Sequence, residues 1–168
     1  GLNPSKTPLL PIIHPAAILR QWSNRAVTVH DLKARVPMAL RGDWRPHPSP
    51  IFWAPPTFEQ AVGRLKLWLS GAEKATLRLA CDIETSRRLI TCVGFADSAN
   101  FAMAIPLVRK TPQGLDSYWT IEQEAELLRL IGQVLNHPNV EIEGQNFIYD
   151  IQYFQLYGIK PRLVFDTM

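Results

Sequence analysis

The 168-residue sequence has only two cysteines, Cys81 and Cys92, and no apolar run that approaches the roughly 20 residues needed to span a bilayer. Both cysteines lie in apolar, strand-like segments, which favours reduced core residues over a disulfide framework or a zinc site. Nothing in the sequence resembles a signal peptide. We therefore expect a soluble, cytoplasmic protein that does not enter a membrane.

Positive charge and proline are concentrated in the first third of the chain. Residues 1–56 contain seven Lys and Arg against two acids, and ten of the fourteen prolines, whereas residues 57–168 contain eleven basic and thirteen acidic residues. A basic, proline-rich segment can follow a phosphate backbone, or it can be a solvated tether. Residues 41–56 contain five prolines and predict an extended linker, so we expect units at 1–40 and 57–168.

Hydrophobic periodicity from residue 57 onwards predicts a mixed α/β fold. Thr57 with Gln60, and Thr120 with Gln123, are spaced as the capping boxes that begin helices. The expected elements, in order, are a helix from Thr57, strands at 76–84, 90–96 and 100–107, a loop at 108–119, a helix from Thr120, a strand at 140–143, a helix at 147–157 and a strand within 159–165. This order predicts a mixed sheet covered by helices.

The segment Asp82-Ile83-Glu84 places two carboxylates one residue apart at the end of an apolar strand. Residues i and i+2 of a strand project from the same face, so the two anions would repel each other there. A cation offsets that repulsion, and oxygen ligands favour Mg²⁺ or Mn²⁺. The alternative is that two solvated acids stand at an exposed strand end without a function.

A second acidic motif is Gly144-Gln145-Asn146-Phe147-Ile148-Tyr149-Asp150. If a helix begins near Phe147, Asp150 lies in its first turn, where the helix dipole favours a carboxylate, and Asn146 can cap the free N–H groups. By itself this motif is equally explained as a capped helix with a favourable acid in its first turn.

Together the two motifs resemble the DEDD (DnaQ-like) 3′–5′ exonucleases, especially the proofreading domains of family A DNA polymerases from bacteria and phage. The 66-residue spacing of Glu84 and Asp150 and the later segment Val164-Phe165-Asp166-Thr167-Met168 are similar to that family as well. The resemblance spans about residues 57–168. It implies a ribonuclease H-like fold, incomplete here, two-metal hydrolysis of a 3′-terminal phosphodiester, binding of a single-stranded DNA 3′ end, and a polymerase domain downstream.

The resemblance also implies roles for individual residues. Asp82 would bridge two Mg²⁺ or Mn²⁺ ions, Glu84 would hold the first ion and orient the attacking water, and Asp150 would hold the second ion. Asn146 and Thr85 would contact substrate. For two aromatic side chains of the second motif helix, Phe147 and Tyr153, stacking on a base is possible, but core packing is the favoured interpretation.

The sequence departs from the family in one respect. The family supplies a fourth carboxylate and a Tyr or His general base in a third motif, and these 168 residues contain neither. Loss of a general base lowers a rate by about 10²–10⁴-fold. We therefore expect weak or no activity from a chain that is truncated before the third motif.

Residues 1–40 contain Ile13-His14-Pro15-Ala16-Ala17-Ile18-Leu19-Arg20, which resembles the histidine motif near the C-terminal end of uracil-DNA glycosylase superfamily domains. His14 is the residue that the resemblance carries over, and residues 27–35 would continue as the last strand and helix. The alternative is a helix that starts at Pro15 and is preceded by an ordinary histidine.

Two other functions fit the same residues. One is a non-catalytic nucleic-acid-binding module of the same fold, in which the basic residues 1–56 hold single strands. The other is an exoribonuclease of the same superfamily, because preference for DNA or RNA depends on recognition of the 2′-OH group.

Overall fold

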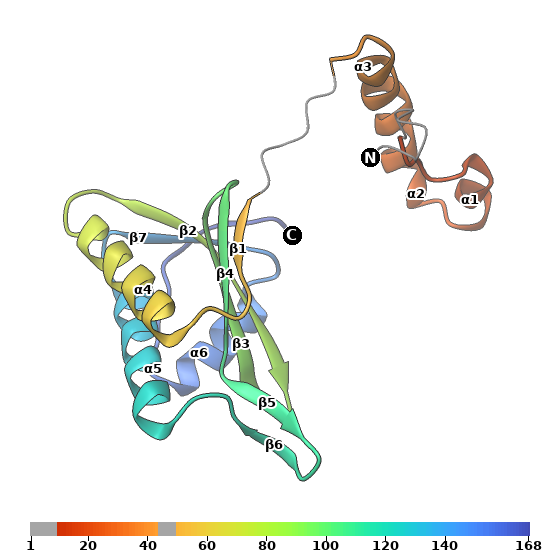
Figure 1. The fold of residues 1–168 in the computed structure, drawn as a ribbon. Coiled ribbons are helices and arrows are strands. Elements are labelled where there is room, and N and C mark those ends of the chain that lie inside the picture. Colours follow the sequence, from red (N-terminus) through yellow and green to blue (C-terminus); the bar gives the residue numbers. More distant parts are fainter. Residues whose placement is uncertain (1–9, 44–49) are drawn as a thin grey trace. The chain divides into compact units, whose positions relative to one another are not determined.

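A computed structural model describes residues 10–43 and 50–168. The chain divides into two units, Gly1–Pro48 and Ser49–Met168 (Figure 1). Each unit is described by itself below.

The second unit is built on a six-stranded mixed sheet in the order β1-β4-β3-β2-β7-β8. Its strands are β1 (Ile51–Trp53), β2 (Leu77–Ser86), β3 (Leu89–Ser98), β4 (Phe101–Pro106), β7 (Val140–Gly144) and β8 (Leu163–Asp166). β2, β3 and β4 form the expected antiparallel meander. β7 runs parallel to β2, and β8 runs parallel to β7.

Three helices connect or precede these strands: α4 (Phe58–Ala72), α5 (Ile121–Asn136) and α6 (Ile148–Leu156). Both predicted capping boxes are present. Thr57 accepts from the Gln60 N–H and Thr120 accepts from the Gln123 N–H, while each glutamine side chain accepts from the N–H of its threonine. α4 and α5 lie side by side against one face of the sheet (Figure 1).

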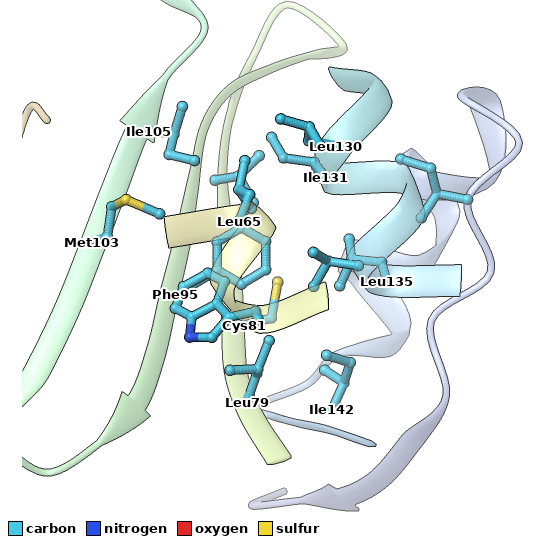
Figure 2. Packing of buried hydrophobic residues seen from close by; sticks show 14 of the residues in the cluster. Leu65, Leu79, Cys81, Phe95, Met103, Ile105, Leu130, Ile131, Leu135 and Ile142 are labelled. Carbon is cyan, nitrogen blue, oxygen red and sulfur yellow. The ribbon is translucent and has the colours of Figure 1, made fainter. Parts of the chain in front are cut away.

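The core lies between that face of the sheet and the helices. Along β2 the alternate residues Leu79, Cys81 and Ile83 are buried, whereas Asp82 and Glu84 are exposed on the other face. Figure 2 shows Leu79 and Cys81 pointing toward side chains from α4 and α5. The period of two in β2 therefore fixes which residues support the fold and which remain available at the surface.

The predicted fold class, a mixed α/β sheet with flanking helices, is confirmed. Two features were not predicted. Residues 51–53, within the expected linker, form β1 and pair parallel with β4. The expected loop contains a hairpin, β5 (Val108–Thr111) and β6 (Gly114–Ser117). Both are short and have little apolar alternation, so no period-two pattern marks them. β1 pairs with β4, and Trp53 packs edge-on against Phe101 with ring centres 5.0 Å apart.

The first unit contains helices α1 (Pro15–Arg20), α2 (Asn24–His30), the π-helix η1 (Asp31–Arg35) and α3 (Val36–Leu40). The expected strand within residues 27–35 is therefore wrong, because the segment is helical throughout. Pro37 has no N–H to donate, and the preceding Val36 N–H reaches back five residues to the Asp31 carbonyl. His14 is the N-cap of α1, with its Nδ1 accepting from the Ala16 N–H at 3.1 Å, as the alternative of a proline-started helix predicts.

Within residues 10–43 and 50–168, no helix is both long enough and apolar enough to cross a membrane.

A half-buried ion pair joins α4 to β3. Arg64 Nη2 lies 2.5 Å from Asp97 Oδ2, and the same oxygen accepts from Trp68 Nε1 at 2.9 Å. The Arg64 guanidinium also lies 3.7 Å from the centre of the Phe101 ring. Asp97 therefore fixes the end of β3 to the helix layer.

Replacing Asp97 with alanine leaves the Arg64 charge and the Trp68 N–H without this acceptor. We expect the free energy of unfolding to fall by about 2–4 kcal/mol, less than for a fully buried pair because both side chains retain some exposure. Urea denaturation measures the change, with Asp116→Ala at an exposed pair in the β5–β6 hairpin as the control. A loss no larger than that of the control would contradict this role.

Candidate active site

The site is created where β7 ends before β2 does. β7 pairs with β2 only as far as Ala80 opposite Glu143, so the following part of β2 has no strand neighbour on that side. The chain leaves β7 at Gly144 and turns into α6, which brings Asp150 against β2. Asp150 Oδ1 accepts from the Ile83 N–H at 2.9 Å. A carboxylate therefore satisfies the main-chain donor that lies between Asp82 and Glu84.

Asp82 and Glu84 stand on the exposed face beside that contact. Both line a groove of about 270 Å³ that also includes Phe52 and Gly94, and Asp82 lines a second groove of about 410 Å³. The pairing of β2 with β3 shifts register between Glu84 and Thr85. Such bulges redirect side chains at the ends of strands and are common beside functional sites. The Thr91 hydroxyl donates to the Glu84 carbonyl at 3.0 Å across this irregularity.

The electrostatics show that these acids act on one another and on their neighbours. Asp150 is only 3% exposed, and burial, followed by the charge of Asp82, raises its pKa, although the Ile83 N–H opposes the shift. Burial and then the charges of Asp150 and Asp82 raise the pKa of Cys81. Burial and then Glu84 and Asp82 raise the pKa of Cys92. This region of the sheet therefore carries a concentrated negative field.

No arginine, lysine or histidine in the described ranges forms an ion pair with Asp82, Glu84 or Asp150. An all-oxygen, uncompensated donor set of this kind suits Mg²⁺ or Mn²⁺. Among the residues that the structure describes, no group of three His, Cys, Asp or Glu side chains lies close enough together to hold a metal ion. The donors fit a divalent ion in chemical type, with Asp150 fixed and Glu84 at the surface.

The turn before α6 differs from the prediction. Asn146 does not cap the helix, because the N-cap is Phe147 and has no side-chain capping bond. Asn146 instead adopts a left-handed backbone conformation (φ +52°), which asparagine tolerates better than most residues. Asp166 of β8 accepts from the N–H groups of Asn146 at 2.8 Å and Phe147 at 2.9 Å. The exposed Asn146 side chain remains available at the surface, and its contact with substrate stays a prediction.

Asp166 is therefore the capping residue that the sequence prediction missed. It lies 20 residues from Asn146, so no local capping pattern could reveal it. Its three N–H partners, the third being Met168, lower its pKa. Asp166 thus stabilises the turn that precedes α6, the helix that carries Asp150.

Thr85 belongs to a chain of three hydroxyl groups beside the acids. Thr85 Oγ1 lies 2.7 Å from the Tyr149 hydroxyl, which donates to the Tyr153 hydroxyl at 3.1 Å. The bond with Thr85, and then that with Tyr153, lowers the pKa of Tyr149. Phe147 is fully buried, in agreement with core packing, and Tyr153 is half-buried against the core. Tyr149 was not among the predicted site residues, although it directly precedes Asp150.

Neither protein-family models nor curated proteins match this chain. The similar solved structures include the EXD2 exonuclease domain soaked in Mn and GMP, with 16% identity, a TM-score of 0.43, and coverage of 64% of this chain and 50% of that one. They also include Trypanosoma brucei RNase D in complex with RNA U12, with 16% identity and a TM-score of 0.45. That match covers 69% of this chain and 37% of the RNase D chain. A third is Escherichia coli RNase D, with 12% identity and a TM-score of 0.43. That match covers 70% of this chain and 27% of the RNase D chain. The chain thus spans half or less of each of these proteins.

Substitutions at Asp150 separate its hydrogen bond from its charge. Because the folded protein raises the Asp150 pKa, it binds the proton more tightly than the unfolded chain does. This residue's contribution to stability therefore falls as pH rises from about 4 through the raised pKa. Asp150→Asn retains an acceptor for Ile83 and removes the charge, so we expect it to gain stability relative to wild type as pH rises.

Asp150→Ala instead leaves the Ile83 N–H without its acceptor, and we expect a loss of about 1–3 kcal/mol at both ends of that pH range. Urea denaturation in EDTA at about pH 4.5 and about pH 7 measures both variants. If Asp150→Asn loses as much stability as Asp150→Ala at the higher pH, the proposed burial of a charge is incorrect.

Proposed function

We propose that residues 57–168 are a metal-dependent nuclease domain of the DEDD type that removes nucleotides from the 3′ end of a single strand. The observation that carries this proposal is the Asp150–Ile83 hydrogen bond. It brings an acid from one motif against the main chain between the two acids of the other motif. The side chains are the types that hydrolysis of a phosphodiester requires, and none of them is neutralised by a described cation.

The residues of the chain have distinct tasks in this proposal. Asp82, Glu84 and Asp150 would hold two Mg²⁺ or Mn²⁺ ions, which supply an activated water and stabilise the leaving oxyanion. The hydrogen bond from Ile83 orients the Asp150 carboxylate, and Asp166 fixes the turn behind it. The Thr85 hydroxyl, held by Tyr149, lies one residue from Glu84 and can accept or donate a hydrogen bond to the terminal sugar.

More specifically, we propose that this nuclease domain is the proofreading exonuclease of a DNA polymerase and that its substrate is DNA. Support comes from the amino-acid sequences of the two motifs, Asp82-Ile83-Glu84-Thr85 and the segment 144–150. We also propose that residues 1–40 are a separate unit, with a glycosylase-like remnant as one interpretation. The expected linker 41–56, apart from the residues that form β1, would connect it to the nuclease domain. Preference for RNA instead of DNA is an outcome of the experiment below.

Incubation of the full chain with Mn²⁺ and 5′-labelled single strands of DNA or RNA of one sequence tests the activity. We expect slow stepwise shortening from the 3′ end, more of DNA than of RNA. Asp82→Asn and Glu84→Gln should each lower the rate at least about 10²-fold, because each removes a ligand of the ions that stabilise the transition state.

Glu73→Gln is the control, since Glu73 is exposed at the C-terminal end of α4 and has no part in the site. Faster shortening of RNA would assign the chain to the exoribonucleases. Shortening that persists in EDTA or in Asp82→Asn would contradict the proposed activity.

A second candidate is the non-catalytic nucleic-acid-binding module. The observation that favours it is in the first unit, where Trp22 is 69% exposed and the Arg25 guanidinium lies 5.4 Å from its ring centre. Exposed aromatic and cationic side chains are used to stack bases and contact phosphates. This function predicts salt-dependent binding that survives removal of Asp82, Glu84 and Asp150 together but disappears when residues 1–48 are deleted, a deletion that leaves β1 in the second unit.

A further inference from the structure

The turn between β2 and β3 is an unusual place for two arginines. Ser86 pairs with Leu89, so the loop consists of Arg87 and Arg88 alone. Both have positive φ values, +49° and +67°, as in the type I′ turn. Such turns favour Asn-Gly, because a side chain with a Cβ is strained in this conformation. Such strain persists only where the surrounding structure or a function maintains it.

The same two residues are exceptional among the arginines of their unit. Residues 50–168 contain seven arginines, and five of them pair with a carboxylate: Arg64, Arg78, Arg109, Arg129 and Arg162. Arg87 and Arg88 are both exposed, and neither side chain forms an ion pair or hydrogen bond within residues 10–43 and 50–168. Their guanidinium donors are therefore available to an external acceptor.

The turn is also next to the candidate active site. Arg87 follows Thr85 by two residues, and Thr85 is bonded to Tyr149. Arg88 lies near enough to Tyr153 for its charge to act on that phenol. Thr85 directly follows Glu84, and the hydroxyl chain Thr85–Tyr149–Tyr153 ends at the phenol on which the charge of Arg88 acts. The two arginines therefore belong to the same surface region as Glu84.

We propose that Arg87 and Arg88 bind the phosphodiester backbone of the single strand whose 3′ end enters the active site. Guanidinium groups form charge-assisted, often bidentate hydrogen bonds with phosphate, and the neighbouring hydroxyls can bond sugar and phosphate oxygens. The turn holds the two side chains on adjacent residues beside β2, so they reach nucleotides on the 5′ side of the terminal one. This inference rests on the proposed function for the direction of the strand, but the binding itself requires no hydrolysis.

The test measures binding of the full chain to fluorescein-labelled oligothymidylate and oligouridylate by anisotropy, in EDTA and over a salt series from about 50 to about 200 mM. For Arg87→Gln with Arg88→Gln we expect about tenfold weaker binding of the better substrate. The slope of log K against log salt should become shallower by about 0.7 for each arginine removed. Arg87→Lys with Arg88→Lys should retain most of the slope.

The matched control is Lys74→Gln with Lys160→Gln. It removes two exposed positive charges near the start of β2 and the start of β8, at the other end of the sheet. If it weakens binding and flattens the slope as much as the arginine pair does, only net charge is involved and the proposal is overturned. Tighter binding of oligothymidylate would indicate a DNA backbone as the ligand, and tighter binding of oligouridylate would indicate an RNA backbone.

Arg87→Asn with Arg88→Gly separates a binding role from a structural one. Because Asn-Gly suits the turn, we expect the melting temperature to rise while binding weakens as in the glutamine variant. A rise in melting temperature with unchanged binding would overturn the proposal. The anisotropy titration contains EDTA and no divalent ion, so it measures binding without hydrolysis. Weaker binding by the arginine variants supports the inference even if the wild type hydrolyses nothing. Undiminished binding contradicts it even if hydrolysis is observed.

Discussion

The hydrogen bond from the Ile83 N–H to Asp150 is the interaction on which the site depends. β7 stops short of the end of β2, and the sheet would otherwise leave a buried main-chain donor without a partner there. Because the acceptor is a carboxylate on α6, the requirement to satisfy that donor also brings a third negative charge beside the two on β2. The same contact therefore satisfies a main-chain donor of the sheet and holds Asp150 against the segment that carries Asp82 and Glu84.

That arrangement has an energetic cost that the rest of the domain offsets. Burial and the nearby Asp82 both disfavour a charged Asp150, as its raised pKa shows. The large apolar core between the sheet and α4, α5 and α6 provides the compensating stability (Figure 2). On the other face, β2 carries its acids into the grooves without disturbing that core, because alternate residues of a strand point in opposite directions.

Much of the architecture could be predicted from the sequence because its signals are local. The capping boxes at Thr57 and Thr120 and the alternation in β2 each depend on residues a few positions apart. The cap supplied by Asp166 and the hydroxyl chain from Thr85 to Tyr153 depend on residues brought together by the fold, so no spacing rule could find them. The strand β1 was missed for the same reason, because it is formed by pairing with the distant β4. The π-helix has a local cause at Pro37, which the expected strand and helix at 27–35 did not take into account.

Calorimetric titration of Mn²⁺ into the wild type, Asp82→Ala and Asp150→Asn tests most directly whether these acids form one site. Binding in the wild type that is lost or weakened at least about tenfold in both variants, and unchanged in Glu73→Gln, is the predicted result. Negligible binding in the wild type, or equal binding in all four proteins, would contradict a metal site built on the contact between α6 and β2.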